Sequence, residues 1–166
     1  MGRIVDLNEM LAIRGELRHH GQRVVFTNGV FDLLHRGHAE YLQKARAIGD
    51  ILVVGINTDA SVRRLKGEAR PLVPLEDRAY LLAALECVDY VVPFAEDTPE
   101  QVIRALLPDV LAKGADYKLE EIVGHDIVLA AGGRVERIPL TPGRATSELI
   151  AKIVERYRPL GKSAPQ

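Results

Sequence analysis

Five short stretches with strand-like patterning, separated by segments of helical periodicity, constrain the fold of this chain more than any other feature. They lie at residues 23–27, 50–56, 88–92, 109–112 and 134–138. Most are near-continuous in Val, Ile and Leu, which is typical of strands buried on both faces of a parallel sheet. The alternation predicts an α/β chain with a Rossmann-like parallel sheet of about five strands and helices on both faces.

The helical segments complete one domain. Apolar residues at helical spacing predict an opening helix within residues 1–20 and a last helix that begins near residue 146. Further helices are expected at residues 37–48, 58–66, 75–86 and 98–107, with short helical material up to residue 131. A chain of 166 residues has the size of a single domain. We therefore expect one domain over residues 1–158 and a disordered tail at 159–166.

Composition limits the partners and the compartment. The formal net charge of −1 argues against a broad nucleic-acid-binding face. A single cysteine, Cys87, excludes an intrachain disulfide and fits a reducing compartment. No apolar run reaches membrane-spanning length, and the chain does not open on a signal-peptide pattern. These features predict a cytoplasmic protein that binds neither nucleic acid nor membranes.

Residues 27–38, which end the first strand and follow it, carry the strongest chemical signal. The segment reads T-N-G-V-F-D-L-L-H-R-G-H and leads into a helix. His35 and His38 are three residues apart around Gly37, so both rings can reach one oxyanion beside the positive end of the helix dipole. This arrangement predicts a phosphate site. Backbone N–H groups would shape its loop at Thr27, Asn28, Gly29 and Phe31.

Two neighbouring histidines could instead be surface residues, helix-capping residues or ligands of a zinc ion. A zinc site needs a third and a fourth ligand, and Cys87 and His125 lie in distant segments. The loop that carries the histidines favours phosphate chemistry, so we expect no metal site made of side chains. The G-x-G-x-x-G, P-loop and G-x-S-x-G motifs are absent from the sequence. Their absence argues against a dehydrogenase, a P-loop enzyme and an enzyme with a nucleophile elbow.

Loops at the carboxyl ends of later strands supply further candidates, because these ends meet at one edge of a parallel sheet. Lys113, Gly114 and Asp116 follow the fourth expected strand and suit contacts with a base or ribose. Thr146 and Ser147 open the last helix, where a helix N-terminus could receive the β- and γ-phosphates of a nucleotide.

Four charged residues allow two interpretations each. Asp59 could accept a hydrogen bond from a ribose hydroxyl or cap a helix. Arg78 opposes the helix dipole in a first turn, so it binds a phosphate, which we prefer, or pairs with its acidic neighbours. Asp32, beside a triphosphate, would orient the loop or a histidine rather than touch the nucleotide. Lys66 could be a solvated lysine at a helix end or a group that neutralises phosphate charge.

The H-x-G-H segment resembles that of the cytidylyltransferase-like nucleotidyltransferases. Within that family the chain is most similar, from about residue 23 to 153, to the adenylyltransferase domain of ADP-heptose synthase. The R-L-K-G stretch at 64–67 and the K-G-A-D-Y-K stretch at 113–118 narrow the likeness to this branch. The resemblance also covers residues 55–62, 70–78, 88–100 and 107–111. It implies the parallel sheet of a nucleotidyltransferase.

The resemblance implies a reaction between ATP and D-glycero-β-D-manno-heptose 1-phosphate that gives ADP-heptose and pyrophosphate, for lipopolysaccharide core synthesis. His35 and His38 would stabilise charge on the transferred phosphate, and Lys66 would neutralise it from the far side. Mg²⁺ is expected with ATP, as the counter-ion of the triphosphate. The domain is often fused to a sugar kinase in this family, so a separate kinase would be needed here. A homodimer is also expected.

Two alternatives stay open. The same chemistry could join CTP to glycerol 3-phosphate or another polyol or sugar phosphate, although Leu140 replaces an arginine that such enzymes usually carry before Thr141. The chain could also be a catalytically silent nucleotide-binding subunit, although its histidines and Lys66 are intact. Two residues depart from the family pattern. Ala145 removes a hydroxyl from the expected phosphate-binding helix start, and Ala115 replaces a glycine and could restrict its loop.

Overall fold

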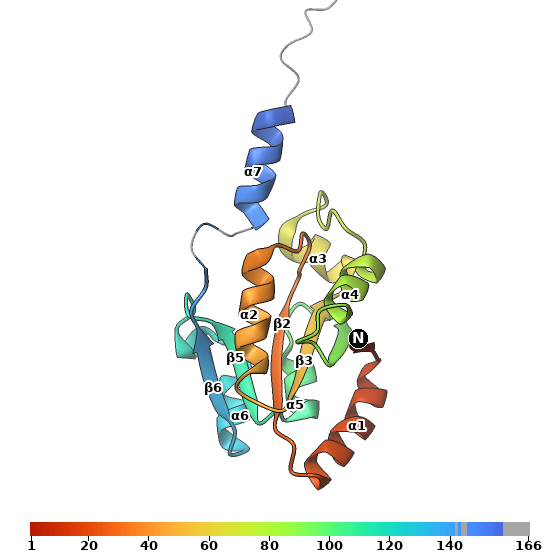
Figure 1. The fold of residues 1–166 in the computed structure, drawn as a ribbon, viewed down its shortest axis with the longest axis vertical. Helices are drawn as coiled ribbons and strands as arrows, with labels where there is room; N and C mark the ends of the chain where they lie inside the picture. Colours follow the sequence, from red (N-terminus) through yellow and green to blue (C-terminus); the bar gives the residue numbers. More distant parts are fainter. Residues whose placement is uncertain (142, 144–145, 158–166) are drawn as a thin grey trace, which may run out of the picture.

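Six parallel strands form one sheet in the order β1-β4-β3-β2-β5-β6 (Figure 1). The computed structural model describes residues 1–141, 143 and 146–157. The strands are β1 (Arg3–Ile4), β2 (Val24–Gly29), β3 (Ile51–Asn57), β4 (Tyr90–Phe94), β5 (Val110–Gly114) and β6 (Arg134–Ile138). The predicted parallel sheet is confirmed. Its sixth strand, β1, escaped prediction because two residues beside β4 are too short to show a period.

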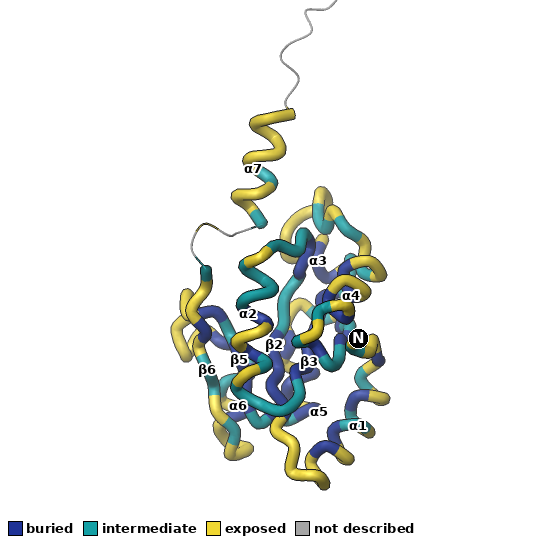
Figure 2. Tube along the Cα trace, viewed as in Figure 1, coloured by how far each residue is buried: buried dark blue, intermediate teal, exposed yellow. Residues whose placement is uncertain are grey.

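Helices cover both faces of the sheet (Figures 1 and 2). They are α1 (Leu7–His19), α2 (Arg36–Arg46), α3 (Asp59–Lys66), α4 (Leu75–Ala83), α5 (Glu100–Leu106), α6 (His125–Ala130) and α7 (Thr146–Tyr157), with a 3₁₀ turn, η1 (Leu119–Glu121). Leu42 of α2 and Leu82 of α4 belong to one buried cluster, whereas Met10 of α1 and Ile103 of α5 belong to a second. Strand β2 supplies both clusters, because its successive side chains point to opposite faces.

Most expected element boundaries shift by one to three residues. Strand β2 continues to Gly29, because Asn28 and Gly29 still pair with Gly55 and Ile56 of β3. Thr27, Asn28 and Gly29 are therefore the last residues of a strand, rather than part of a loop. In the same way Lys113 and Gly114 end β5. These changes place the expected site residues on the rigid edge of the sheet.

The first helix is joined to the body of the domain by Arg14, whose side chain is buried. Its guanidinium donates to the carbonyl oxygens of Leu106 (3.3 Å) and Leu107 (3.0 Å) and to Asp109 (3.0 Å). Leu107 ends α5 in the left-handed region, with φ of +44°. The second carboxylate oxygen of Asp109 accepts from the backbone N–H of Val24 at 2.7 Å. Helices α1 and α5 and strand β2 therefore meet around one ion pair.

The order in which the strands are added reverses between β2 and β5, although all six strands run parallel. Strands β3, β4 and β1 lie on one side of β2, and strands β5 and β6 lie on the other. Loops that leave the carboxyl ends of β2 and β5 run to opposite sides, so a crevice opens between them, as expected for this class of sheet. Helix α7 has no buried residue and stands away from the sheet (Figures 1 and 2).

Candidate active site

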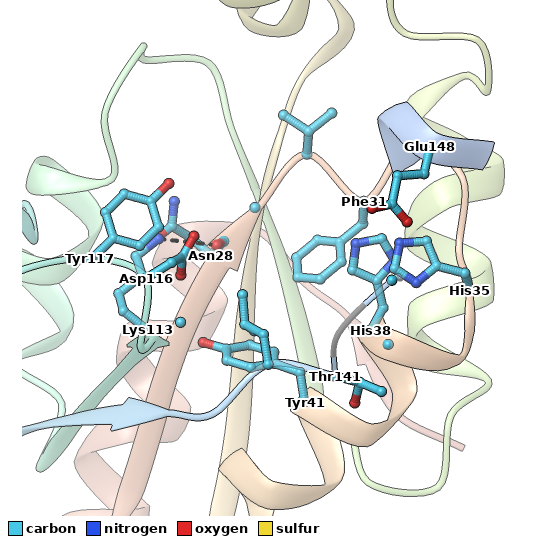
Figure 3. A pocket seen from close by; sticks show the side chains of 16 residues that line it. Asn28, Phe31, His35, His38, Tyr41, Lys113, Asp116, Tyr117, Thr141 and Glu148 are labelled. Carbon is cyan, nitrogen blue, oxygen red and sulfur yellow. Dashed lines mark hydrogen bonds between the residues drawn. The ribbon is translucent and has the colours of Figure 1, made fainter. Parts of the chain in front are cut away.

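A pocket of about 340 Å³ lies at the carboxyl ends of β2 and β5 (Figure 3). Three segments far apart in the sequence form it: the end of β2 with the start of α2, the end of β5, and the stretch after β6. Its lining residues are Asn28, Gly29, Val30, Phe31, His35, Gly37, His38, Tyr41, Lys113, Gly114, Asp116, Tyr117, Leu140, Thr141, Gly143 and Glu148. Nine residues predicted from the sequence are in this set.

The two histidines form one side of the pocket. Their rings are stacked, with centroids 3.8 Å apart and planes 20° from parallel. Burial lowers the pKa of His38 to about 4, and the nearby His35 charge contributes to the same shift. His38 is therefore neutral at pH 7. Its Nδ1 is buried with no hydrogen-bond partner among the described residues. A neutral ring at the N-terminus of α2 can donate one N–H to a phosphate oxygen.

Phe31 supports this pair from within the loop. It adopts the left-handed region with φ of +48°, which is uncommon for a residue other than glycine. Its ring meets the His38 ring edge to face, with centroids 5.3 Å apart. A Cβ at Gly29 would lie only 3.0 Å from the Phe31 ring, so a larger residue there would displace the ring. Gly29 thus leaves room for the Phe31 ring.

Lys113 and Asp116 lie at the opposite end of the pocket (Figure 3). The Lys113 ammonium donates to the carbonyl oxygen of Asn28 at 3.2 Å. Burial lowers the pKa of Lys113 to about 8, although the Asp116 carboxylate acts in the opposite direction. Asn28 Oδ1 is buried and has no hydrogen-bond partner among the described residues. This end offers a cation, a carboxylate and an amide, which together suit a hydroxyl-bearing or heterocyclic group.

Gly114 allows the Asp116 side chain to fold back over the end of β5. A Cβ at Gly114 would lie 2.3 Å from an Asp116 carboxylate oxygen and 3.1 Å from Leu140. The glycine predicted for ligand contact therefore has a steric role. Ala115 causes no backbone strain, because only Phe31 and Leu107 among the described residues other than glycine have positive φ. The expected restriction at Ala115 is wrong. Ala145 lies outside the described residues.

Arg78 is fully buried and binds protein groups, so the prediction that it contacts a phosphate directly is wrong. Its guanidinium donates to three carbonyl oxygens and, at 2.6 Å, to the Asp59 carboxylate. Asp59 therefore pairs with Arg78 and does not line the pocket. It is not the helix cap either, because the Thr58 side chain accepts from the Ser61 N–H. Tertiary contacts from four segments, invisible in the sequence, decide both outcomes.

Thr27, Lys66, Thr146 and Ser147 also lie outside the pocket lining. The Thr27 hydroxyl is buried and hydrogen-bonded to the Tyr41 hydroxyl at 2.8 Å. Lys66 is exposed at the end of α3, and Thr146 and Ser147 form the first turn of α7. The structure does not bring these three into the pocket. Roles for them in phosphate binding therefore stay predictions.

Seven lining residues were missed by sequence reasoning: Val30, Tyr41, Tyr117, Leu140, Thr141, Gly143 and Glu148. Tyr41 had a usable signal, because it follows His38 by three residues on one helix face. Thr141 lies three residues after the end of β6, and its hydroxyl donates to the Glu40 carboxylate. Glu148 points toward the histidines from the first turn of α7 (Figure 3), and its sequence position alone carries no such signal.

Two further expectations concern metal binding by side chains and helices that cross a membrane. No group of three or more His, Cys, Asp and Glu side chains in the described part of the chain could hold a metal ion. Asp116 and Glu148 are carboxylates on the pocket wall, Asp116 at the Lys113 end and Glu148 near the histidines. None of the helices in the described ranges is both long and apolar enough to cross a membrane.

Comparison with known proteins agrees with this geometry. The family model described as cytidylyltransferase-like matches residues 26–139. The bifunctional protein HldE of Citrifermentans bemidjiense is 64% identical over 137 residues, which are 82% of this chain and 28% of that protein. HldE of Geobacter sulfurreducens is 54% identical over 155 residues, 93% of this chain and 32% of that protein. The chain thus spans about a third of the length of these relatives.

Two solved structures share the fold. A lipopolysaccharide core biosynthesis protein from Thermoplasma volcanium superposes with a TM-score of 0.60 at 30% identity, over 73% of this chain and 98% of that one. A pantoate-beta-alanine ligase from Francisella tularensis has a TM-score of 0.63 at 16% identity, over 89% of this chain and 69% of that one. The second likeness concerns the fold alone. Together with the matched segment, these relatives show that the chain belongs to the cytidylyltransferase-like family.

Proposed function

We propose that this chain is an adenylyltransferase that joins ATP and D-glycero-β-D-manno-heptose 1-phosphate to give ADP-heptose and pyrophosphate. The observation that carries the proposal is one pocket with a stacked histidine pair at one end and Lys113 with Asp116 at the other. Similarity to HldE proteins and to a lipopolysaccharide core biosynthesis protein favours a sugar phosphate over other acceptors. The chain spans about a third of the length of those bifunctional relatives, and the separate sugar kinase that the family resemblance implies stays a proposal.

The chemistry needs little proton transfer, because a phosphate oxygen is already ionised at neutral pH. An oxygen of the sugar phosphate attacks the α-phosphorus of ATP, the bond from that phosphorus to the bridging oxygen breaks, and pyrophosphate leaves. The barrier comes from bringing two anions together in line. His35 and His38 would donate hydrogen bonds to the oxygens that gain charge, beside the positive end of α2.

The remaining residues would bind and orient. Lys113, Asp116 and Asn28 would hold ribose, base or sugar hydroxyl groups at the far end of the pocket. The phosphates would also be approached by three residues that do not line the pocket: Lys66, Thr146 and Ser147. Mg²⁺ bound to the triphosphate would neutralise phosphate charge, with Glu148, near the histidines, as the side chain able to hold it while the ion keeps its waters. We also propose a homodimer, as the family resemblance implies, and a cytoplasmic location, as the composition predicts.

The test is pyrophosphate release with each of ATP, CTP, GTP and UTP against a panel of sugar and polyol phosphates. We expect turnover with ATP and the heptose 1-phosphate, lost in His38→Ala and retained in His19→Ala, an exposed histidine at the end of α1. Turnover with CTP and glycerol 3-phosphate would keep the mechanism and change the substrate. Nucleotide binding with no release for any pair would indicate a silent binding subunit.

A further inference from the structure

Asp32 makes an unusually complete set of bonds with a loop that follows α3. Its side chain is 1% exposed. The carboxylate accepts from the backbone N–H groups of Leu72 (2.8 Å) and Val73 (2.9 Å) and from Nε of Arg70 at 2.5 Å. Burial alone would raise the pKa of Asp32, but these donors outweigh it and hold the pKa below its ordinary value. Asp32 is therefore a buried, charged and fully bonded group.

Arg78 binds the same two segments from the other side. It donates to the carbonyl oxygen of Val73 at 2.9 Å and to that of Val30 at 2.7 Å. Val73 is thus held at its N–H by Asp32 and at its carbonyl by Arg78. Two buried charges of opposite sign therefore cross-link residues 30–32 to residues 70–73.

Phe31 lies between the two points of attachment. Val30 is bonded through its carbonyl and Asp32 through its carboxylate, so the residue between them has little freedom. A left-handed backbone at such a residue is unfavourable and persists only where its surroundings hold it. The Phe31 ring, directed by this backbone, meets the ring of His38. The same cross-link begins four residues after Lys66.

We propose that Asp32 and Arg78 are positioning residues that hold Phe31 in its left-handed conformation and thereby fix the ring of His38. They also fix the loop after Lys66 relative to the two histidines. Neither residue lines the pocket. The consequence for catalysis rests on the proposed function, whereas the consequence for loop and ring is a property of the ligand-free protein.

The experiment uses Asp32→Asn, which keeps the size of the side chain and removes its charge. The amide keeps one oxygen that can accept from Leu72 and Val73, which both bond Oδ1, but it places an N–H against Nε of Arg70 at the Oδ2 position. In the ligand-free protein we expect the Leu72 and Val73 amides to exchange about tenfold faster, since their bonds to a charged acceptor become bonds to a neutral one, a difference of about 1.4 kcal/mol. The matched control is Glu100→Gln, which removes an exposed carboxylate paired with Arg104 on α5 and should change neither amide.

A second readout follows the ring of His38 by NMR titration. With the cross-link weakened, the ring becomes more hydrated, and we expect its pKa to rise by about one unit. If the proposed substrates are turned over, kcat should fall about 10- to 100-fold with a smaller change in KM, since the reacting groups are misplaced rather than removed.

The outcomes separate the two proposals. Faster exchange and a shifted His38 titration without any turnover in the parent protein would support positioning and count against the proposed reaction. Unchanged exchange and titration in a folded Asp32→Asn variant would overturn the positioning role, whatever the activity. Should that variant not fold, Arg70→Ala decides, because Arg70 is partly exposed and its loss leaves both amide bonds in place. In Arg70→Ala, a rise in the pKa of His38 that is smaller than in Asp32→Asn supports the proposal, and an unchanged pKa of His38 overturns it.

Discussion

The imidazole rings of His35 and His38 lie stacked at the first turn of α2, close enough that two positive charges would repel each other strongly. In the free protein, burial and this repulsion keep His38 neutral. An anion between the rings and the helix N-terminus reverses the balance, because it stabilises the protonated form. The pair can therefore change its charge in response to phosphate.

A titration of the ligand-free protein should show His38 with a pKa of about 4, well below its usual 6.5. Addition of ATP should raise that pKa, so binding at pH 5 to 6 takes up protons. Calorimetry in two buffers of different ionisation enthalpy measures the uptake, and NMR assigns it. A pKa near 6.5 in the free protein would contradict the burial of this ring.

Replacement of His38 by Ala should reduce kcat by about 10²- to 10³-fold, the usual effect of losing one donor to a developing oxyanion. The free energy of unfolding should change little by comparison, because the ring makes no hydrogen bond through Nδ1 with the described residues. Chemical denaturation and steady-state kinetics on the same preparation separate the two effects. An equal loss of stability and activity would mean that the residue is structural.

Lys113→Met should stabilise the protein near pH 7 by about 1–2 kcal/mol, net of the lost hydrogen bond to Asn28, and abolish nucleotide binding. The folded pKa is lowered from 10.5 to about 8, so between these values the unfolded chain binds more protons and parent stability rises with pH. The advantage of Met is therefore largest below pH 8 and declines toward pH 10.5. Lys118→Met, at an exposed lysine nearby, should leave nucleotide binding intact.

The buried hydroxyl pair of Thr27 and Tyr41 should behave as a coupled unit. Tyr41→Phe leaves the Thr27 hydroxyl without its partner and should cost about 1–2 kcal/mol in the free energy of unfolding. Introducing Thr27→Val into the Tyr41→Phe variant should lower the free energy of unfolding by less than Thr27→Val does in the parent protein. The reason is that no hydroxyl is then left without its partner. Urea denaturation of the four proteins of the cycle tests this. Tyr80→Phe, at an exposed hydroxyl, should be neutral.

The sequence predicts the sheet and the histidine pair well, because both depend on local pattern. Apolar runs such as residues 51–56 identify buried strands, and the spacing of His35 and His38 predicts that both rings reach one site, as their stacking at the pocket shows. The same reasoning placed Lys113 and Asp116 at the correct edge of the sheet. Periodicity could not reveal β1, since two residues gain their strand conformation only from pairing with β4.

Arg78 shows why the rest could not be predicted. The sequence correctly predicts that Arg78 lies in the first turn of α4. Its hydrogen-bond partners, however, come from residues 30, 57, 59 and 73. Only the assembled fold brings those acceptors together. From the sequence alone, Arg78 therefore looks like a cation without partners, whereas in the structure its guanidinium donates to four protein acceptors. Tyr41 and Glu148 belong to the same category, because helix packing places them at the pocket.

The contact between Arg14 and the end of α5 bears on how the protein can be shortened. The family match begins at residue 26 and would suggest a fragment without α1, β1 or the start of β2. Such a fragment loses Met10, Leu17 and Val24 from the buried cluster behind the sheet. It also leaves the carbonyls of Leu106 and Leu107 without their guanidinium donor. The segment that the family model matches is thus smaller than the packed unit, to which α1 and the start of β2 contribute buried side chains.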